Sequence, residues 1–254
     1  MGVASSTEIT IRIGTNAVDS GTGSNQITNP SATSSYAIDI GKGASTMQDS
    51  GQVRVAIIDE VTVTASVDTS LTFTVSGVGS GATVNSSPTT TAAATTNTTL
   101  PFGTLVDGVS KTLAQDLSVA TNADNGFVVT VEQTGELQSS TGADINGFVD
   151  GSYTTTPTAW QSPSGTIGSL DTYGHWGLTS DDAVTPSRAA AFGANQWVSG
   201  STTPIIIMEH TGPSDGLISG EGANRIGYQI EITALQEAGD DYTTTLRYVA
   251  TPTF

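Results

Sequence analysis

The residue types that most often carry out catalysis are few in this chain. It has two histidines, His175 and His210, and no cysteine. Catalysis by serine, histidine and aspartate needs the three side chains within mutual reach. The segment 173–177 (Tyr-Gly-His-Trp-Gly) is instead typical of a packed aromatic turn. We therefore expect both histidines to have structural roles, and we expect that the protein is not an enzyme.

Acidic residues are the largest group of titratable side chains, with 24 Asp and Glu against 7 Lys and Arg. A glycoside hydrolase needs two carboxyl groups, one of which has its pKa raised by apolar surroundings. Only Glu209, which follows a run of isoleucines, lies in such a context. The acidic residues therefore do not predict a hydrolase.

One acidic segment has the alternating oxygen atoms of a cation site. Residues 144–150 (Asp-Ile-Asn-Gly-Phe-Val-Asp) place Asp144, Asn146 and Asp150 around a glycine. The segment lacks the length and the final Glu of an EF-hand loop, and Asp and Asn are also common in ordinary turns. We predict no cofactor and no dedicated metal site, with weak Ca²⁺ binding at these three residues as the alternative.

The net charge of −17 limits the classes of partner. Such a surface repels nucleic-acid phosphates and anionic lipids, so we expect no nucleic-acid partner. No stretch approaches the ~18 consecutive apolar residues of a transmembrane helix, and we expect no membrane insertion. Solubility explains the charge, and attraction of cations is the alternative.

The three tryptophans, Trp160, Trp176 and Trp197, all lie within residues 134–200. Their rings could form a platform on which a sugar stacks, which makes carbohydrate a candidate partner. Aromatic side chains also dominate sandwich cores, and we expect core packing to be their role.

The strongest pattern in the chain is the stretch 53–75, where apolar residues occupy odd positions and Thr, Ser and Asp mostly lie between them. A period of two is the signature of half-buried strands. Residues 68–70 (Asp-Thr-Ser) are the expected place for a bend or a break. We expect this stretch to be the central β-element; its apolar residues are Val53, Val55, Ile57, Val61, Val63, Val67, Leu71, Phe73 and Val75.

Other segments continue the pattern of strands separated by turns. Residues 205–208 are apolar on both faces, which predicts a central or covered strand. Residues 77–99 read as an exposed loop of low complexity, and Asn125-Gly126 is a pair favoured in hairpins. We predict an all-β fold, a β-sandwich of jelly-roll type; the further strands are expected at 7–13, 36–40, 113–119, 126–131, 226–232 and 242–250.

The sequence near the N-terminus predicts a strand that could pair with the sheet of another molecule. Ile9, Ile11 and Ile13 share one face, and a linker rich in Gly, Ser, Asn and Thr follows. We therefore divide the chain into a strand and flexible arm, residues 1–35, and a sandwich domain, residues 36–254. An apolar strand needs a sheet to join, and burying three isoleucines would contribute about 5–8 kcal/mol before ordering costs. The alternative is an edge strand of its own domain.

Two stretches resemble secreted bacterial surface β-proteins: 102–105 followed by 117–131, and the C-terminal residues 238–254. They are similar to surface proteins of candidate-phylum bacteria and, more loosely, to WxL-type domains. A more distant similarity is to biofilm fibre subunits of the TasA type, jelly rolls that polymerise by donating an N-terminal strand. The resemblance covers about residues 53–254 in outline, although Arg247 stands where such tails carry an uncharged residue. It implies an exported, envelope-associated sandwich and no catalytic residues.

These patterns predict an extracellular or cell-surface structural subunit that assembles with itself. The expected product is a pilus-like filament or a surface layer, a homopolymer joined by the strand that holds Ile9, Ile11 and Ile13. One alternative is a monomeric surface adhesin that binds carbohydrate or Ca²⁺. Another is a structural protein of a phage or virus.

Overall fold

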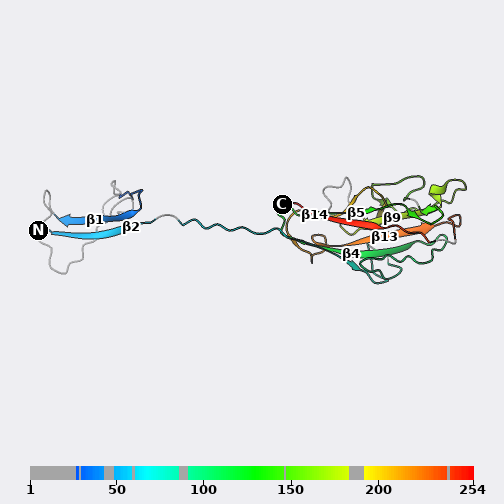
Figure 1. Ribbon diagram of the computed structural model, residues 1–254, viewed down its shortest axis with the longest axis horizontal. Coiled ribbons are helices and arrows are strands. Elements are labelled where there is room, and N and C mark those ends of the chain that lie inside the picture. Colours follow the sequence, from blue (N-terminus) through cyan, green and yellow to red (C-terminus); the bar gives the residue numbers. More distant parts are fainter. Residues whose placement is uncertain are drawn as a thin grey trace. The chain divides into compact units, whose positions relative to one another are not determined.

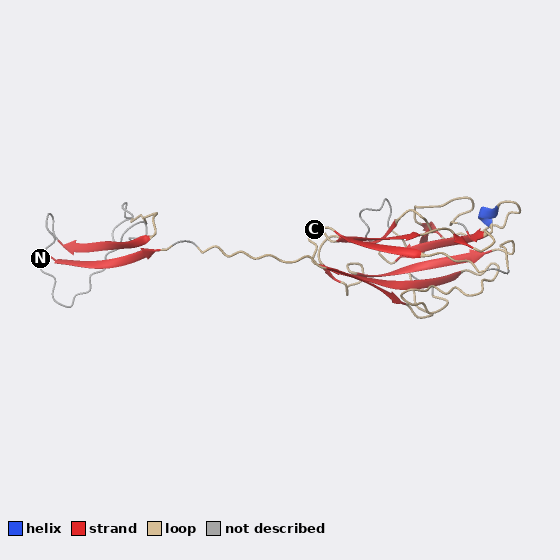
Figure 2. Ribbon diagram, in the orientation of Figure 1, coloured by secondary structure: helices blue, strands red, loops and turns tan. Residues whose placement is uncertain are grey.

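The computed structural model describes residues 27–28, 30–42, 49–58, 61–85, 91–145, 147–182, 192–238 and 241–254. Apart from one 3₁₀ turn (Leu170–Thr172), their regular structure is antiparallel β-sheet, which confirms the all-β class and fits a sandwich (Figures 1 and 2). The jelly-roll type stays a prediction. Within these ranges, no helix has the length and apolar composition needed to cross a bilayer.

The chain divides into two compact units, Met1–Ser66 and Val67–Phe254. This division differs from the predicted one, which placed the start of the sandwich domain at residue 36. In the first unit, β1 (Ser34–Lys42) and β2 (Asp49–Ile57) form a two-stranded antiparallel sheet. Tyr36 lies opposite Val55, and Ile38 lies opposite Val53. Because opposite residues share a face, one face of this ribbon is apolar.

The second unit contains two main sheets and a short ribbon. In the larger sheet the strands are β3 (Leu71–Gly77), β4 (Lys111–Thr121), β13 (Ala223–Ile232), β9 (Gly174–Ser180), β10 (Gln196–Ser199) and β8 (Thr158–Ala159), with β12 (Ser214–Asp215) also beside β4. The smaller sheet has the order β11 (Ile205–His210), β5 (Phe127–Gln133) and β14 (Leu246–Pro252). The ribbon pairs β6 (Leu137–Gln138) with β7 (Asp144–Ile145).

One hydrophobic core joins the two main sheets. Val119 of β4, Val129 of β5 and Ile226 of β13 are fully buried in it. The ring of Tyr228 stacks on the ring of Trp176 with centroids 5.7 Å apart. The alternation along these strands places every second side chain in this core, as the period-two pattern predicts.

The stretch 53–75 is not one central element, contrary to the prediction. Its first part ends with β2 and its last part is β3, which lies at the edge of the larger sheet. Between them, Val61, Val63 and Val67 belong to no strand and are 85–88% exposed. The sequence of 61–67 alternates as a strand does, but none of the described strands pairs with this segment.

Three other local predictions differ from the structure wholly or in part. Asn125-Gly126 does not close a hairpin, because β4 and β5 belong to different sheets; Gly126 has φ +75° and turns the chain from one sheet to the other. The strand at 205–208 is covered but lies at an edge, within β11. The loop 77–99 is not fully exposed, since Val84 is completely buried.

Candidate functional site

The sheet edges differ in how well they are protected against pairing with another chain. Natural proteins block such edges with short strands, bulges, charges or proline. β8 has two residues, β11 contains a register shift between Ile206 and Met208, and β14 carries Arg247 and Pro252. β3 is seven residues long with a regular register and has no charge and no proline. Among the described strands, β3 is therefore the edge that is most open to pairing.

β3 and β14 end the two sheets on the same side of the core, which we call the open side. The rings of Phe73 in β3 and Tyr248 in β14 meet edge to face, 6.3 Å apart. The core-facing residues of both strands remain partly exposed, and those of β14 are Leu246, Tyr248 and Ala250. An added strand would cover apolar surface here.

A hydrogen-bonded chain of side chains ties β14 to the larger sheet behind the open side. The hydroxyl groups of Tyr228 and Tyr248 are bonded to each other, and the Tyr248 hydroxyl donates to Gln115 Oε1 at 2.7 Å. Burial raises the pKa of both tyrosines above the ordinary value. The charge and hydrogen bond of Tyr248 raise the pKa of Tyr228 further, whereas the bond from Tyr228 lowers the pKa of Tyr248 by less than burial raises it. The pair therefore stays neutral and hydrogen-bonded at physiological pH.

The chain that enters β3 is fixed by the side chain of Asn122. Its Oδ1 accepts a hydrogen bond from the Ser70 amide at 2.8 Å, and its Nδ2 donates to the carbonyl oxygen of Asp68 at 2.7 Å. Thr121 Oγ1 also donates to the carbonyl oxygen of Ser70, at 2.7 Å. These bonds continue the β3–β4 ladder by side chains, so residues 68–70 run on in line with β3.

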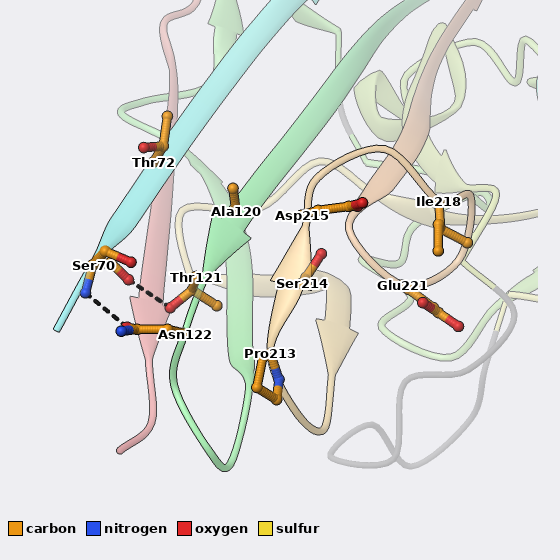
Figure 3. A pocket seen from close by; sticks show the side chains of 10 residues that line it. All are labelled: Ser70, Thr72, Ala120, Thr121, Asn122, Pro213, Ser214, Asp215, Ile218 and Glu221. Atoms are coloured by element: carbon orange, nitrogen blue, oxygen red, sulfur yellow. Dashed lines mark hydrogen bonds between the residues drawn. The ribbon is translucent and has the colours of Figure 1, made fainter. Parts of the chain in front are cut away.

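A shallow, open pocket of about 540 Å³ lies beside the same strand ends (Figure 3). Thr72, Ala120 and Asp215 lie opposite one another across three strands, on the face away from the core. Its lining is rich in hydroxyl and carboxylate groups: Ser70, Thr72, Ala120, Thr121, Asn122, Pro213, Ser214, Asp215, Ile218 and Glu221. Hydroxyl and carboxylate groups on an open surface can hydrogen-bond sugar hydroxyls.

The sequence reasoning missed that residues 212–216 read Gly-Pro-Ser-Asp-Gly, which matches the Gly-x-Ser-x-Gly pattern of hydrolases. That pattern needs a sharp turn from a strand into a helix. Here Ser214 lies in β12, and a loop follows it. Its Oγ accepts a hydrogen bond from the Gly216 amide at 3.1 Å, and within the described part of the chain no hydrogen bond joins it to a histidine. The match therefore does not predict a nucleophile.

His175 is buried and bonded through both ring nitrogens. Nδ1 lies 2.7 Å from the carbonyl oxygen of Gln161, and Nε2 lies 3.0 Å from Asp150 Oδ1. The rings of Phe148 and Trp160 pack edge-on against it. These contacts agree with the structural role expected of His175.

The predicted site residues fall partly outside the described residues. Ile9, Ile11, Ile13 and Asn146 all lie there. Asp144 is in β7, where its carbonyl oxygen accepts a hydrogen bond from Gln236 Nε2 at 3.0 Å.

Asp150 already has protein partners, because it contacts His175 and accepts a hydrogen bond from the Ser164 amide at 3.2 Å. Burial raises the pKa of its carboxyl, but the Ser164 bonds and His175 outweigh burial and lower the pKa below its usual value. In the part of the chain that the structure describes, no group of three or more His, Asp or Glu side chains could hold a metal ion.

The tryptophans pack inside the protein. Trp176 and Trp197 are buried, which confirms the core role predicted for them. Trp160 is partly exposed, stacks on Phe148 with centroids 4.7 Å apart, and donates to Glu231 Oε2 at 2.7 Å. The three rings therefore do not form an exposed platform for a sugar.

Comparison with known proteins adds no family to this description. A scan against protein-family models finds no matching family, and a search of curated proteins finds no match. The function is therefore inferred from the fold and its edges.

Proposed function

We propose that the protein is an extracellular structural subunit that assembles with itself into a filament or a surface layer. In this proposal, the strand that holds Ile9, Ile11 and Ile13 is donated to the next copy. The observation that supports it is the open side, where two neighbouring edge strands leave core-facing apolar side chains partly exposed. Strand addition supplies what such an edge lacks, namely backbone partners and apolar cover.

We assign the edge of β14 as the acceptor of the donated strand, because it belongs to the smaller sheet, although Arg247 and Pro252 make this edge less open to pairing than that of β3. β14 is the outer strand of a three-stranded sheet that faces a seven-stranded sheet across the core. A donated strand would become the fourth strand of the smaller sheet. Its isoleucines recur at every second residue, as do Leu246, Tyr248 and Ala250, so the two apolar faces can lie side by side.

The geometry of donation determines the type of assembly. Donor and acceptor are different surfaces of each copy, so the contact is head-to-tail and repeats without closing unless its rotation forms a ring. A homopolymer of this kind needs no catalytic site and no cofactor. The polar, acidic surface keeps the subunits soluble before they assemble.

A single substitution tests the donated strand in the full chain. Ile11→Asp places a charge on the face that would be buried, where an unpaired carboxylate is very costly. We expect sedimentation velocity to show loss of the polymers that the unsubstituted protein forms. Thr10→Asp, on the opposite face, is the matched control and should still polymerise.

Equal polymerisation of the two variants would contradict the donor role of this strand. Measured on dissociated monomers, the melting temperature of the second unit should be the same in both variants, since the substitutions lie outside it and no donated strand is bound.

The second candidate is a monomeric adhesin that binds carbohydrate, and the hydroxyl and carboxylate groups at the open pocket beside β3 favour it. These groups suit sugar hydroxyls better than the packed tryptophans do. The same sedimentation experiment separates the two functions. An adhesin stays monomeric with or without the charge at position 11.

A further inference from the structure

The segment 61–67 (Val-Thr-Val-Thr-Ala-Ser-Val) has the sequence of a strand but no sheet. Its apolar and hydroxyl side chains alternate without interruption, and most are β-branched, the type that favours strands. Val61 and Val63 are 85% and 88% exposed. In Figure 2 the segment is drawn as loop, and no described strand pairs with it. A segment of this kind is suited to pairing with an open edge.

β3 offers such an edge, and its free side can be identified. Along a strand, successive residues direct their N–H and C=O groups to opposite edges. Asp68 and Ser70 direct theirs toward β4, through Asn122 and Thr121. The backbone groups of Thr69 and of the odd-numbered residues of β3 therefore point to the free edge.

We propose that two copies of the chain pair through residues 61–77 as one antiparallel ribbon, with a two-fold axis at Thr69. Residues 61–67 of each copy lie along β3 of the other. The contact is independent of the proposed strand donation, since it uses a different segment and leaves the β14 edge free. It joins the larger sheets of two copies into one continuous sheet.

The register of this ribbon matches the side chains on both faces. Val67 lies opposite Leu71, Ala65 opposite Phe73 and Val63 opposite Val75, all on the core-facing side. Ser66 lies opposite Thr72, Thr64 opposite Thr74 and Thr62 opposite Ser76, all on the outer side. A shift by one residue would place hydroxyl groups against the apolar face. Both segments have seven residues and no charge. Asp68 is the charged residue of the ribbon, and its two copies lie diagonally across the axis, where their repulsion is a small cost of the pairing.

A second copy is a better partner for β3 than the segment of the same chain. The same register would also arise if residues 61–67 folded back on their own β3, with a hairpin turn at 68–70. Asn122 opposes that turn, because it holds Asp68 and Ser70 in line with β3. Exchange of a strand between two copies is a low-cost route to a dimer. It is favoured here because the hairpin within one chain is opposed by Asn122.

A pair of engineered cysteines distinguishes these arrangements in the full chain, which has no cysteine of its own. Ser66 and Thr72 form a non-hydrogen-bonded pair in the ribbon, with Cα atoms about 4.5 Å apart, within disulfide range. We expect S66C/T72C to give a covalent dimer on mild oxidation, seen on a non-reducing gel. Each single variant should stay mostly uncrosslinked, because equivalent Ser66 residues lie about 20 Å apart along the ribbon.

The other outcomes would overturn the proposal. A disulfide within one monomer would show that the hairpin closes on its own chain, and no disulfide would show that the segment is unpaired. Adding Ile11→Asp to S66C/T72C separates this contact from strand donation. The covalent dimer should form as before, even where the polymer is lost.

Discussion

Asp150 shows how a single residue acquires a role that its local sequence does not indicate. Its carboxylate contacts His175 and the Ser164 amide. The local sequence 144–150 suggested a calcium ligand. The contact with His175 could not be predicted from it, because only the fold brings residue 175 next to residue 150. The same holds for Asn122, which reads as a turn residue but fixes the entry to β3.

The lowered pKa of Asp150 predicts how stability depends on pH. A carboxyl whose pKa is lower in the folded than in the unfolded state stabilises the fold above its unfolded pKa, and loses that contribution as the pH falls through the folded pKa. For Asp150 the loss begins near its ordinary value of 3.8. We expect Asp150→Asn to lower the free energy of urea unfolding at pH 7, and the difference from the unsubstituted protein to shrink toward pH 3.

Asp215→Asn is the matched control, because Asp215 is exposed and accepts a hydrogen bond from the Leu217 amide within its own loop. Its effect at pH 7 should be smaller. An Asp150→Asn difference that grows as the pH falls would contradict the sign of the pKa shift.

At the scale of elements, the alternation of apolar and polar residues located strands correctly where the strand pairs with another strand of the same chain. It placed 226–232 within β13 and 113–119 within β4. It failed at 61–67, since a period of two shows that a segment suits a sheet but not whether that sheet belongs to the same molecule. Asn125-Gly126 fixes a local turn, and a turn that changes sheets has the same local requirement as a hairpin.

The tyrosine pair that ties β14 to the larger sheet can be tested by removing one hydroxyl. Tyr248→Phe leaves Gln115 Oε1 without its donor and removes the bond to Tyr228. We expect a loss of about 1–3 kcal/mol in the free energy of unfolding, measured by denaturant titration. Tyr173→Phe removes a hydroxyl that accepts a hydrogen bond in an exposed loop, and should cost less. Equal losses would show that the buried pair has no special contribution.

At the scale of the whole molecule, composition and alternation predicted the all-β class but not the order of the strands. β4 pairs with β13, about a hundred residues later in the chain, and no local pattern encodes such a pairing. The division at residue 66 was missed because a polar linker was expected to mark the boundary. In the segment before the division, residues 61–66, apolar side chains instead alternate with hydroxyl side chains.

At the same scale, we propose that the open edges of β3 and β14 lead the protein to assemble with copies of itself. Strand donation to β14 would extend the assembly, and pairing across β3 would join two copies side by side. Both contacts use backbone hydrogen bonds and apolar faces, so a high salt concentration should not dissolve them as it would a contact between charges.

Negative-stain electron microscopy of the purified, unsubstituted protein tests this account most directly. The account predicts filaments or ordered layers with a regular repeat of one subunit or one pair. A field of single, separate particles at concentrations up to those used for sedimentation would contradict it.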